Sequence, residues 1–363
     1  MKRVLLSFLL LVLFCSAFAQ NEIRQMVDSM RRYRNIPGLV YAVFTTDAII
    51  DSGTSGVKKM RVRGPVQWQN RFQIGTTTTT FTSYIAARMV QEGKISWNTT
   101  LLKVFPEIEG KTMKIYHRVT LQQLITQRVG LPPYDEYKEY RDIHSMPGTP
   151  SQQRAAFVLM MLKRRPATVI DSSEAVYSVA GTAIVAAMLE RVSKKSWEQL
   201  VEQYINKPLN IRAGFDFPAL KDSTQPWGHW DNYFNLTTHI DDYWARFFPA
   251  IAPAGNINIS IGDYITFLRD HMLALQNKKS VIGNAMANRL MFQPPGYAAG
   301  WFNGKWRGLS IAYFLGRAGL FSSYAEVIKE KNMGIIILCN SGTVDGRSGI
   351  LNLARSLREY YVK

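Results

Sequence analysis

The chain has 363 residues, 47% of them hydrophobic, which is enough to bury one large core or two smaller ones. Its formal net charge of +17 predicts attraction to anionic polymers of a cell envelope. The basic residues are scattered in short pairs such as Lys58-Lys59 and Arg164-Arg165, and no basic stripe is interleaved with aromatic residues. This pattern argues against a nucleic-acid-binding protein.

The first 19 residues have the pattern of a secretory leader. A basic start precedes an apolar run, residues 4–14, that is too short to span a bilayer, and residues 17–19 form a small-x-small cleavage site. We therefore expect cleavage near Ala19 and export to the periplasm or the extracellular space. Cys15 offers a lipoprotein signal as the alternative, but the bulky residue before it argues against that. No later segment is long and apolar enough for a transmembrane helix.

The first part of the mature chain reads as a helix, two strands and a second helix. Residues 21–34 fit a surface helix, and the apolar run 36–44, opened by turn residues, fits a strand. Residues 47–56 fit a turn into a second strand. After Thr76 the apolar residues recur at helical spacing, and Gly93 closes that helix.

The later part begins with helical patterns and polar loops over residues 95–210, followed by an irregular, aromatic-rich stretch over residues 215–250. The elements expected from regular patterns are helices at 180–192, 260–274 and 346–361, and strands at 309–315, 322–329 and 333–339. Cys339 ends the last strand. We expect it to be a buried structural thiol, because leader removal leaves it no disulfide partner.

A catalytic motif is suggested by Phe72-Gln-Ile-Gly-Thr-Thr-Thr-Thr-Thr-Phe-Thr82. This segment resembles the nucleophile segment of the serine β-lactamase and penicillin-binding-protein family, in particular its class C and esterase branch. The family pattern, Phe-x-Ile-Gly-Ser-x-x-Lys-x-x-Thr, places Thr76 at the nucleophilic serine and Thr79 at the lysine. Thr79 has no amine to accept a proton from a neighbouring hydroxyl. Losing one member of such a coupled pair typically costs roughly 10⁴–10⁶ in rate.

Further landmarks resemble the same family in the same order along nearly the whole mature chain. They are Ile36-Pro37-Gly38, Thr120 to Thr126 with Gly130-Leu131-Pro132, Pro208 to Ile211, Pro253-Ala254-Gly255 and Gly300-Trp301. The resemblance implies an α/β (α+β) fold of the β-lactamase/transpeptidase type. Its antiparallel sheet is flanked by the N- and C-terminal helices, and an all-helical lobe is inserted. We expect a sheet lobe from residues 20–75 and 251–363, a helical lobe from residues 76–250, and a cleft between them.

Two further family motifs have partial matches. Tyr177-Ser178-Val179 stands where the family has Tyr-Ser-Asn; the tyrosine would serve in proton transfer, whereas Val179 lacks the amide that contacts substrate. A packed tyrosine is the alternative. The Lys-Thr-Gly or His-x-Gly motif corresponds to residues 314–319, with Phe314 at the Lys/His position; a shifted register would place Gly316 or Arg317 there. Arg317 could bind a carboxylate, or it could be an exposed turn residue.

No other catalytic signature is present. The sequence has no Gly-x-Ser-x-Gly elbow, no His-Glu-x-x-His motif and no paired-cysteine metal motif, so we expect no metal and no cofactor. Two aromatic-rich segments, one containing Trp227, His229 and Trp230 and the other spanning residues 243–248, could line the cleft and hold a ligand. Packing against the helical lobe is the alternative interpretation.

Together these patterns predict an exported, catalytically inactive member of a serine-hydrolase family, that is, a pseudoenzyme. It would be a monomer that binds a peptide, an ester or a cell-envelope ligand in the inter-lobe cleft. One alternative is a slow esterase, β-lactamase or peptidase that uses Thr76 as nucleophile. Another is a structural or partner-binding envelope protein that uses its basic surface.

Overall fold

The computed structural model describes residues 22–62, 64–134, 137–170, 174–231, 236–237 and 248–362. The predicted leader lies outside these ranges, as do residues 232–235 and 238–247 of the aromatic-rich stretch and with them most of the predicted ligand segment 243–248. Within them, no helix combines the length and apolar character needed to cross a bilayer.

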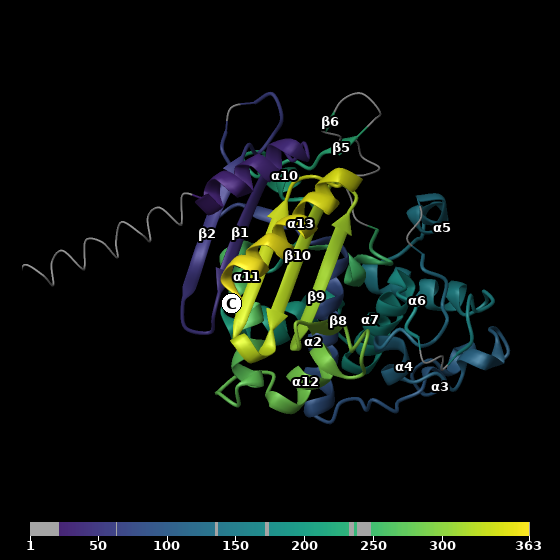
Figure 1. Ribbon diagram of the computed structural model, residues 1–363. Helices are drawn as coiled ribbons and strands as arrows, with labels where there is room; N and C mark the ends of the chain where they lie inside the picture. The colour runs from purple at the N-terminus through teal and green to yellow at the C-terminus, as the bar shows by residue number, and fades with distance from the viewer. Residues whose placement is uncertain are drawn as a thin grey trace, which may run out of the picture.

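The central element is a six-stranded antiparallel sheet in the order β2-β1-β11-β10-β9-β8 (Figure 1). Its strands are β1 (Gly38–Phe44), β2 (Ile49–Gly56), β8 (Phe302–Trp306), β9 (Leu309–Ala318), β10 (Phe321–Ile328) and β11 (Met333–Cys339). The first and last thirds of the chain therefore meet at the pairing of β1 with β11, where Leu39 lies opposite Cys339.

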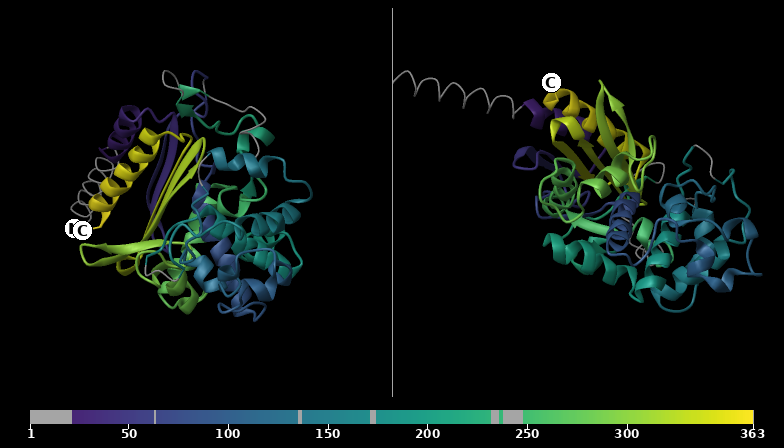
Figure 2. Two further views of the ribbon diagram at one scale, coloured as in Figure 1. Left: turned by 90° about the vertical axis from the view of Figure 1, so that its right-hand side faces the viewer. Right: turned by 90° about the horizontal axis from the view of Figure 1, so that it is seen from below.

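Side chains alternate between the two faces of this sheet, and both faces are covered. Leu39, Tyr41 and Val43 of β1 face the N-terminal helix, residues 22–33, and α13 (Val344–Tyr361). The intervening residues Val40, Ala42 and Phe44 face the main core. Figure 2 shows the two terminal helices together on one side of the sheet and the helical lobe on the other. The predicted layers are thus confirmed.

The helical layer begins with α2 (Thr78–Gln91), which packs against α7 (Val179–Ser193) and α12 (Asn284–Phe292). The other α-helices are α3 (Leu101–Val104), α4 (Leu121–Ile125), α5 (Arg141–His144), α6 (Pro150–Met161), α8 (Trp197–Val201), α9 (Lys207–Leu209), α10 (Pro218–Lys221) and α11 (Ile261–Leu275). Capping by Thr120, Thr149 and Ser196 fixes the starts of α4, α6 and α8.

A small three-stranded sheet connects the layers. It consists of β3 (Arg71–Gln73), β7 (Ile257–Ser260) and β4 (Gly214–Phe215), with β7 in the middle. Two further strands, β5 (Trp230–Asp231) and β6 (Leu236–Thr237), are two residues long each and pair with one another. The division into lobes at residues 76 and 250 remains a prediction. Strand β4 belongs to the predicted helical lobe and β7 to the predicted sheet lobe, and the two strands pair with each other.

Candidate active site

The threonine run lies where the small sheet leads into the helical layer. Thr76 sits in a 3₁₀ turn, Gly75–Thr77, that follows β3, and Thr79 belongs to the first turn of α2. Thr76 is half-buried, whereas Thr79 is only 1% exposed. The sequence places both residues on the first turn of one helix; in the structure the tighter turn carries Thr76 and the α-helix begins at Thr78.

The Thr79 hydroxyl is held by two other hydroxyls. Its Oγ1 lies 2.9 Å from the hydroxyl oxygen of Tyr177 and 3.4 Å from Oγ1 of Thr182. Within the described residues these are its hydrogen-bond partners, and none is an amine or an imidazole. The structure therefore brings Thr79 and Tyr177 together through a neutral hydrogen bond.

Thr182 and Gln127 complete this network, although the sequence did not single them out. The Gln127 amide donates to Thr182 Oγ1 at 3.3 Å, and its oxygen accepts the backbone N–H of Ser178 at 3.1 Å. Gln127 has a positive φ of 59° and is buried. Gln127 lies within the landmark that runs from Thr120 to Pro132, but its conformation and its partners are visible only in the fold.

Strand β9 approaches the threonine turn closely at Gly316. A Cβ at this position would lie 2.2 Å from Thr77 Oγ1 and 2.3 Å from the Ile74 carbonyl oxygen. The next residue, Arg317, donates its backbone N–H to Thr76 Oγ1 at 3.3 Å. Gly316 thus occupies a position where only a glycine permits this approach. The assignment of Phe314, two residues earlier, to the Lys/His position stays a prediction.

Phe314 fills the space beside Tyr177. The two rings meet edge-on with centroids 5.7 Å apart, and Phe314 is 2% exposed. Tyr297 and Phe302 also contact the Tyr177 ring, at centroid distances of 6.1 and 6.3 Å. An apolar aromatic wall therefore stands where the family resemblance implies a lysine or histidine.

Val179 begins α7 and is buried, with 4% of its surface exposed. Its backbone N–H donates to the Pro133 carbonyl at 2.9 Å, and the Ser178 hydroxyl caps the helix. The backbone around Tyr177 is thereby fixed. The Val179 side chain adds no polar atom to the site.

Three of the remaining predicted residues take part in contacts between a cation and an aromatic ring. The Arg317 guanidinium lies over the ring of Trp230 at 4.9 Å, and both side chains are exposed. Trp227 is partly exposed and carries the Lys59 ammonium 3.5 Å above its ring. These contacts form two cation–π pairs.

His229 lies between these tryptophans in the chain but is fully buried. Its Nε2 accepts the Met60 N–H at 3.1 Å, so Nδ1 carries the proton and donates to the Asn340 carbonyl at 2.8 Å. Burial lowers the pKa of His229 to about 4. The neutral imidazole thus uses both nitrogens to connect the backbone at Met60 with the backbone at Asn340. Of the predicted residues, His229 is the least suited to contact a ligand.

The arrangement offers hydroxyls, one backbone N–H and a surface guanidinium. None of the described contacts to Thr76 or Thr79 comes from a group that could accept a proton near neutral pH. Among the described residues, no group of three or more His, Cys, Asp or Glu side chains could hold a metal ion.

Comparison with known proteins shows which proteins this chain resembles in sequence and in fold. The chain is 21% identical over 403 aligned residues to a protein named Beta-lactamase from Escherichia coli (strain K12), covering 97% of this chain and 99% of that protein. Its fold is similar to the octameric penicillin-binding protein homologue from Pyrococcus abyssi, with a TM-score of 0.74, 20% identity, and coverage of 93% and 77%. It is also similar to a class C beta lactamase from Rhodobacter sphaeroides, with a TM-score of 0.71, 16% identity, and coverage of 93% and 99%.

The two structural likenesses establish the fold. A family profile described as Beta-lactamase matches residues 23–357 of the 363-residue chain. This chain therefore belongs to the Beta-lactamase family.

Proposed function

We propose that this protein uses the β-lactamase fold to bind a ligand without forming an acyl-enzyme. The ligand would be a peptide, an ester or a cell-envelope fragment, held in the predicted cleft beside Thr76. The observation that carries the proposal is the hydrogen-bonding of Thr79, whose partners are the hydroxyls of Tyr177 and Thr182. A hydroxyl bonded to hydroxyls cannot activate Thr76 as an amine would.

Ligand recognition would rest on the exposed pair of Arg317 and Trp230. The Arg317 backbone N–H already contacts Thr76, so its side chain leaves β9 directly beside the predicted cleft. A guanidinium recognises a carboxylate through two parallel hydrogen bonds, and an indole offers a stacking surface. A ligand with a carboxylate next to an apolar or ring-shaped group fits this pair.

Covalent labelling tests the absence of acylation. The mature chain is incubated with a fluorescent penicillin, with the Escherichia coli Beta-lactamase as positive control, and its intact mass is measured. We expect no added mass on this chain. A burst of labelling that disappears in Thr76→Ala would contradict the proposal.

Equilibrium binding tests the recognition step. N-acetyl-D-Ala-D-Ala serves as the probe in calorimetric titration of the native chain and of Arg317→Gln. Loss of a charged hydrogen-bonding partner should weaken binding about tenfold. Equal affinity in both proteins would remove Arg317 from the site.

A slow hydrolase is the second candidate, with Thr76 as nucleophile and Tyr177 as base. It is favoured by the Arg317 N–H beside Thr76, since such a donor can stabilise a developing oxyanion. It requires turnover of a chromogenic cephalosporin that is lost in Tyr177→Phe. Turnover that survives this substitution would exclude Tyr177 as the base.

We also infer that the protein is exported, on the strength of the leader pattern in residues 1–19. Amino-terminal sequencing of the protein from a fractionated cell should give a start at Gln20. A cytoplasmic protein that retains Met1 would contradict this inference.

A further inference from the structure

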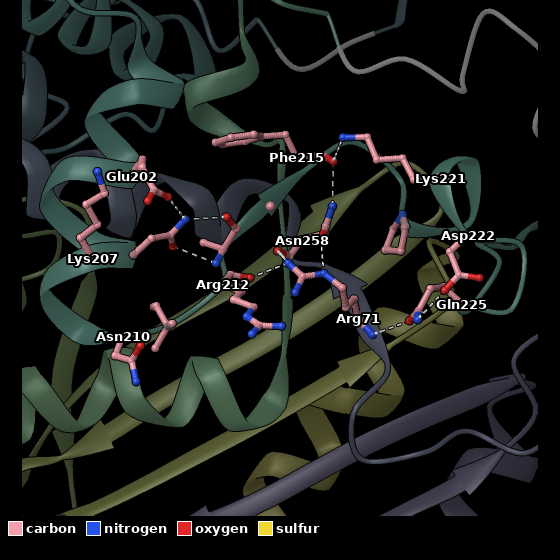
Figure 3. Close-up of a pocket in the computed structure, with 15 residues that line it drawn as sticks. Arg71, Glu202, Lys207, Asn210, Arg212, Phe215, Lys221, Asp222, Gln225 and Asn258 are labelled. Atoms are coloured by element: carbon pink, nitrogen blue, oxygen red, sulfur yellow. Dashed lines mark hydrogen bonds between the residues drawn. The ribbon is translucent and has the colours of Figure 1, made fainter.

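A separate hollow of about 530 Å³ lies beside the small sheet, between β3, β4, α9 and α10. This volume is within the range of pockets that hold small organic ligands. Figure 3 shows Arg71, Arg212 and Asn258 in its middle, with Glu202 to one side and Asp222 to the other. None of these residues contributes to the contacts of Thr76 or Thr79.

Arg71 is fixed in this pocket by neutral acceptors. Its Nε donates to the Asn258 side-chain oxygen at 2.7 Å. Its Nη2 donates to two backbone carbonyls, that of Arg212 at 2.6 Å and that of Asn258 at 2.8 Å. The remaining terminal nitrogen, Nη1, has two N–H groups without a partner among the described residues. The guanidinium is thus held rigidly while one of its edges stays available.

The charge around Arg71 is incompletely balanced. The Arg212 side chain also lines the pocket, and neither guanidinium forms an ion pair within the described parts of the chain. Burial lowers the pKa of Arg71; Asp263 opposes this effect, and the nearby charge of Arg212 adds to it. Two like charges side by side are unfavourable, and an anion between them would relieve the repulsion.

The other charged residues at the rim form no ion pair with Arg71 or Arg212 among the described residues. Lys221 is ion-paired with Asp216 at 3.5 Å, and Asp222 accepts hydrogen bonds from Thr224 and Gln225. The Glu202 carboxylate accepts from Asn206 at 3.0 Å. The carboxylates nearest the pocket are therefore already engaged in local contacts.

We propose that this pocket is a second ligand site that binds a small organic oxyanion, a carboxylate or a phosphate monoester, between Arg71 and Arg212. The Arg71 Nη1 edge and the Arg212 guanidinium supply the forked donors that match such groups. Phe215, Ile211 and Pro218 also line the hollow and would contact the apolar part of the ligand.

Calorimetric titration of the whole mature chain with phenyl phosphate and with benzoate, in low-salt buffer free of phosphate, tests this site. Arg212→Gln is the main variant, because the Arg212 side chain makes no described fold contact, whereas Arg71→Gln would also break the frame around Asn258. We expect at least one probe to bind, and Arg212→Gln to weaken it about tenfold or more. Stronger binding of one probe identifies phosphate or carboxylate as the preferred group.

Two variants serve as controls. Arg118→Gln removes an exposed arginine from the helical lobe and should leave the affinity unchanged. Arg317→Gln separates this pocket from the threonine site: it should remove any binding of the probe beside Thr76 and leave the binding that depends on Arg212 unchanged. The proposal is overturned if neither probe binds at millimolar concentration, if Arg212→Gln binds as the native chain does, or if binding is lost in Arg317→Gln instead.

Discussion

The threonine site and the arginine pocket differ in how they place charge, although both grow from one short segment. Arg71 opens β3 and lies in the pocket, and Thr79 lies eight residues later in α2. The pocket holds a guanidinium in a rigid frame of neutral acceptors. The threonine site, in contrast, joins hydroxyls to hydroxyls beneath an aromatic wall. The same fold thus fixes a positive charge at one end of the segment and a neutral network at the other.

The largest effect is expected from restoring the family's ionisable groups at the threonine site, because this would remove its neutral character. The combined variant Thr76→Ser, Thr79→Lys, Val179→Asn and Phe314→His places an amine and an imidazole beside a primary hydroxyl. General acid–base catalysis should then raise hydrolysis of a chromogenic ester about 10²-fold or more. Initial rates of the variant and the native chain measure the effect.

The matched control is the triple variant that leaves Thr79 unchanged. Because the amine is the group that activates the hydroxyl, this variant should stay close to the native rate. Equal rates for the triple and the combined variant would mean that Thr79 does not occupy the position of the base.

Gly316→Ala tests the close approach that builds the threonine site. Its Cβ would overlap Thr77 Oγ1 and the Ile74 carbonyl, so β9 must move, and we expect a loss of about 3 kcal/mol in the free energy of unfolding. Urea denaturation measures it. Gly304→Ala on β8 is the control, because a Cβ there meets no atom within 4 Å, and its effect should be close to zero. Similar losses in both variants would contradict the packing argument.

His229, which the sequence predicts at the ligand site, is buried and neutral in the structure, and the pH dependence of stability tests this. The pKa of His229 is about 4 in the folded protein against an ordinary value of 6.5. As the pH falls through this range, the unfolded chain binds a proton that the folded chain does not. The free energy of unfolding should therefore fall by about 2 kcal/mol between about pH 7.5 and about pH 5.

His229→Gln should remove this part of the pH dependence, as measured by urea denaturation at both pH values. His117→Gln, which changes a half-buried histidine in the helical lobe, should keep it. An unchanged pH dependence in His229→Gln would mean that another group is responsible.

Thr79→Val gives the smallest expected effect and tests the hydroxyl network directly. It keeps the shape of the side chain but removes the hydrogen bonds to Tyr177 and Thr182, at a cost of about 1 kcal/mol in unfolding free energy. Thr79→Ser retains the hydroxyl and should cost less. Thermal unfolding followed by circular dichroism compares the two, and the reverse order would argue that packing, not hydrogen bonding, holds Thr79.

Most of the regular elements could be predicted from apolar periodicity. The helix expected at 260–274 is α11 (Ile261–Leu275), and the strand expected at 333–339 is β11 with the same bounds. Several elements had no sequence signal, among them the short strands of the small sheets, β8 and α12. Strand β8 contains glycine and lysine and lies at the sheet edge, so it lacks an alternating pattern, and α12 is short and only partly buried.

The sequence by itself determined the family, the layer order and the absence of a lysine at position 79, because these depend on motif spacing and side-chain identity. Only the tertiary structure decided the partners. Thr79 meets Tyr177 across 98 positions, and Arg71 meets Asn258 across 187. Such contacts follow from strand pairing and helix packing between distant segments, which no local pattern encodes. For the same reason Gln127, Thr182 and the pocket of Arg71 and Arg212 became visible only in the fold.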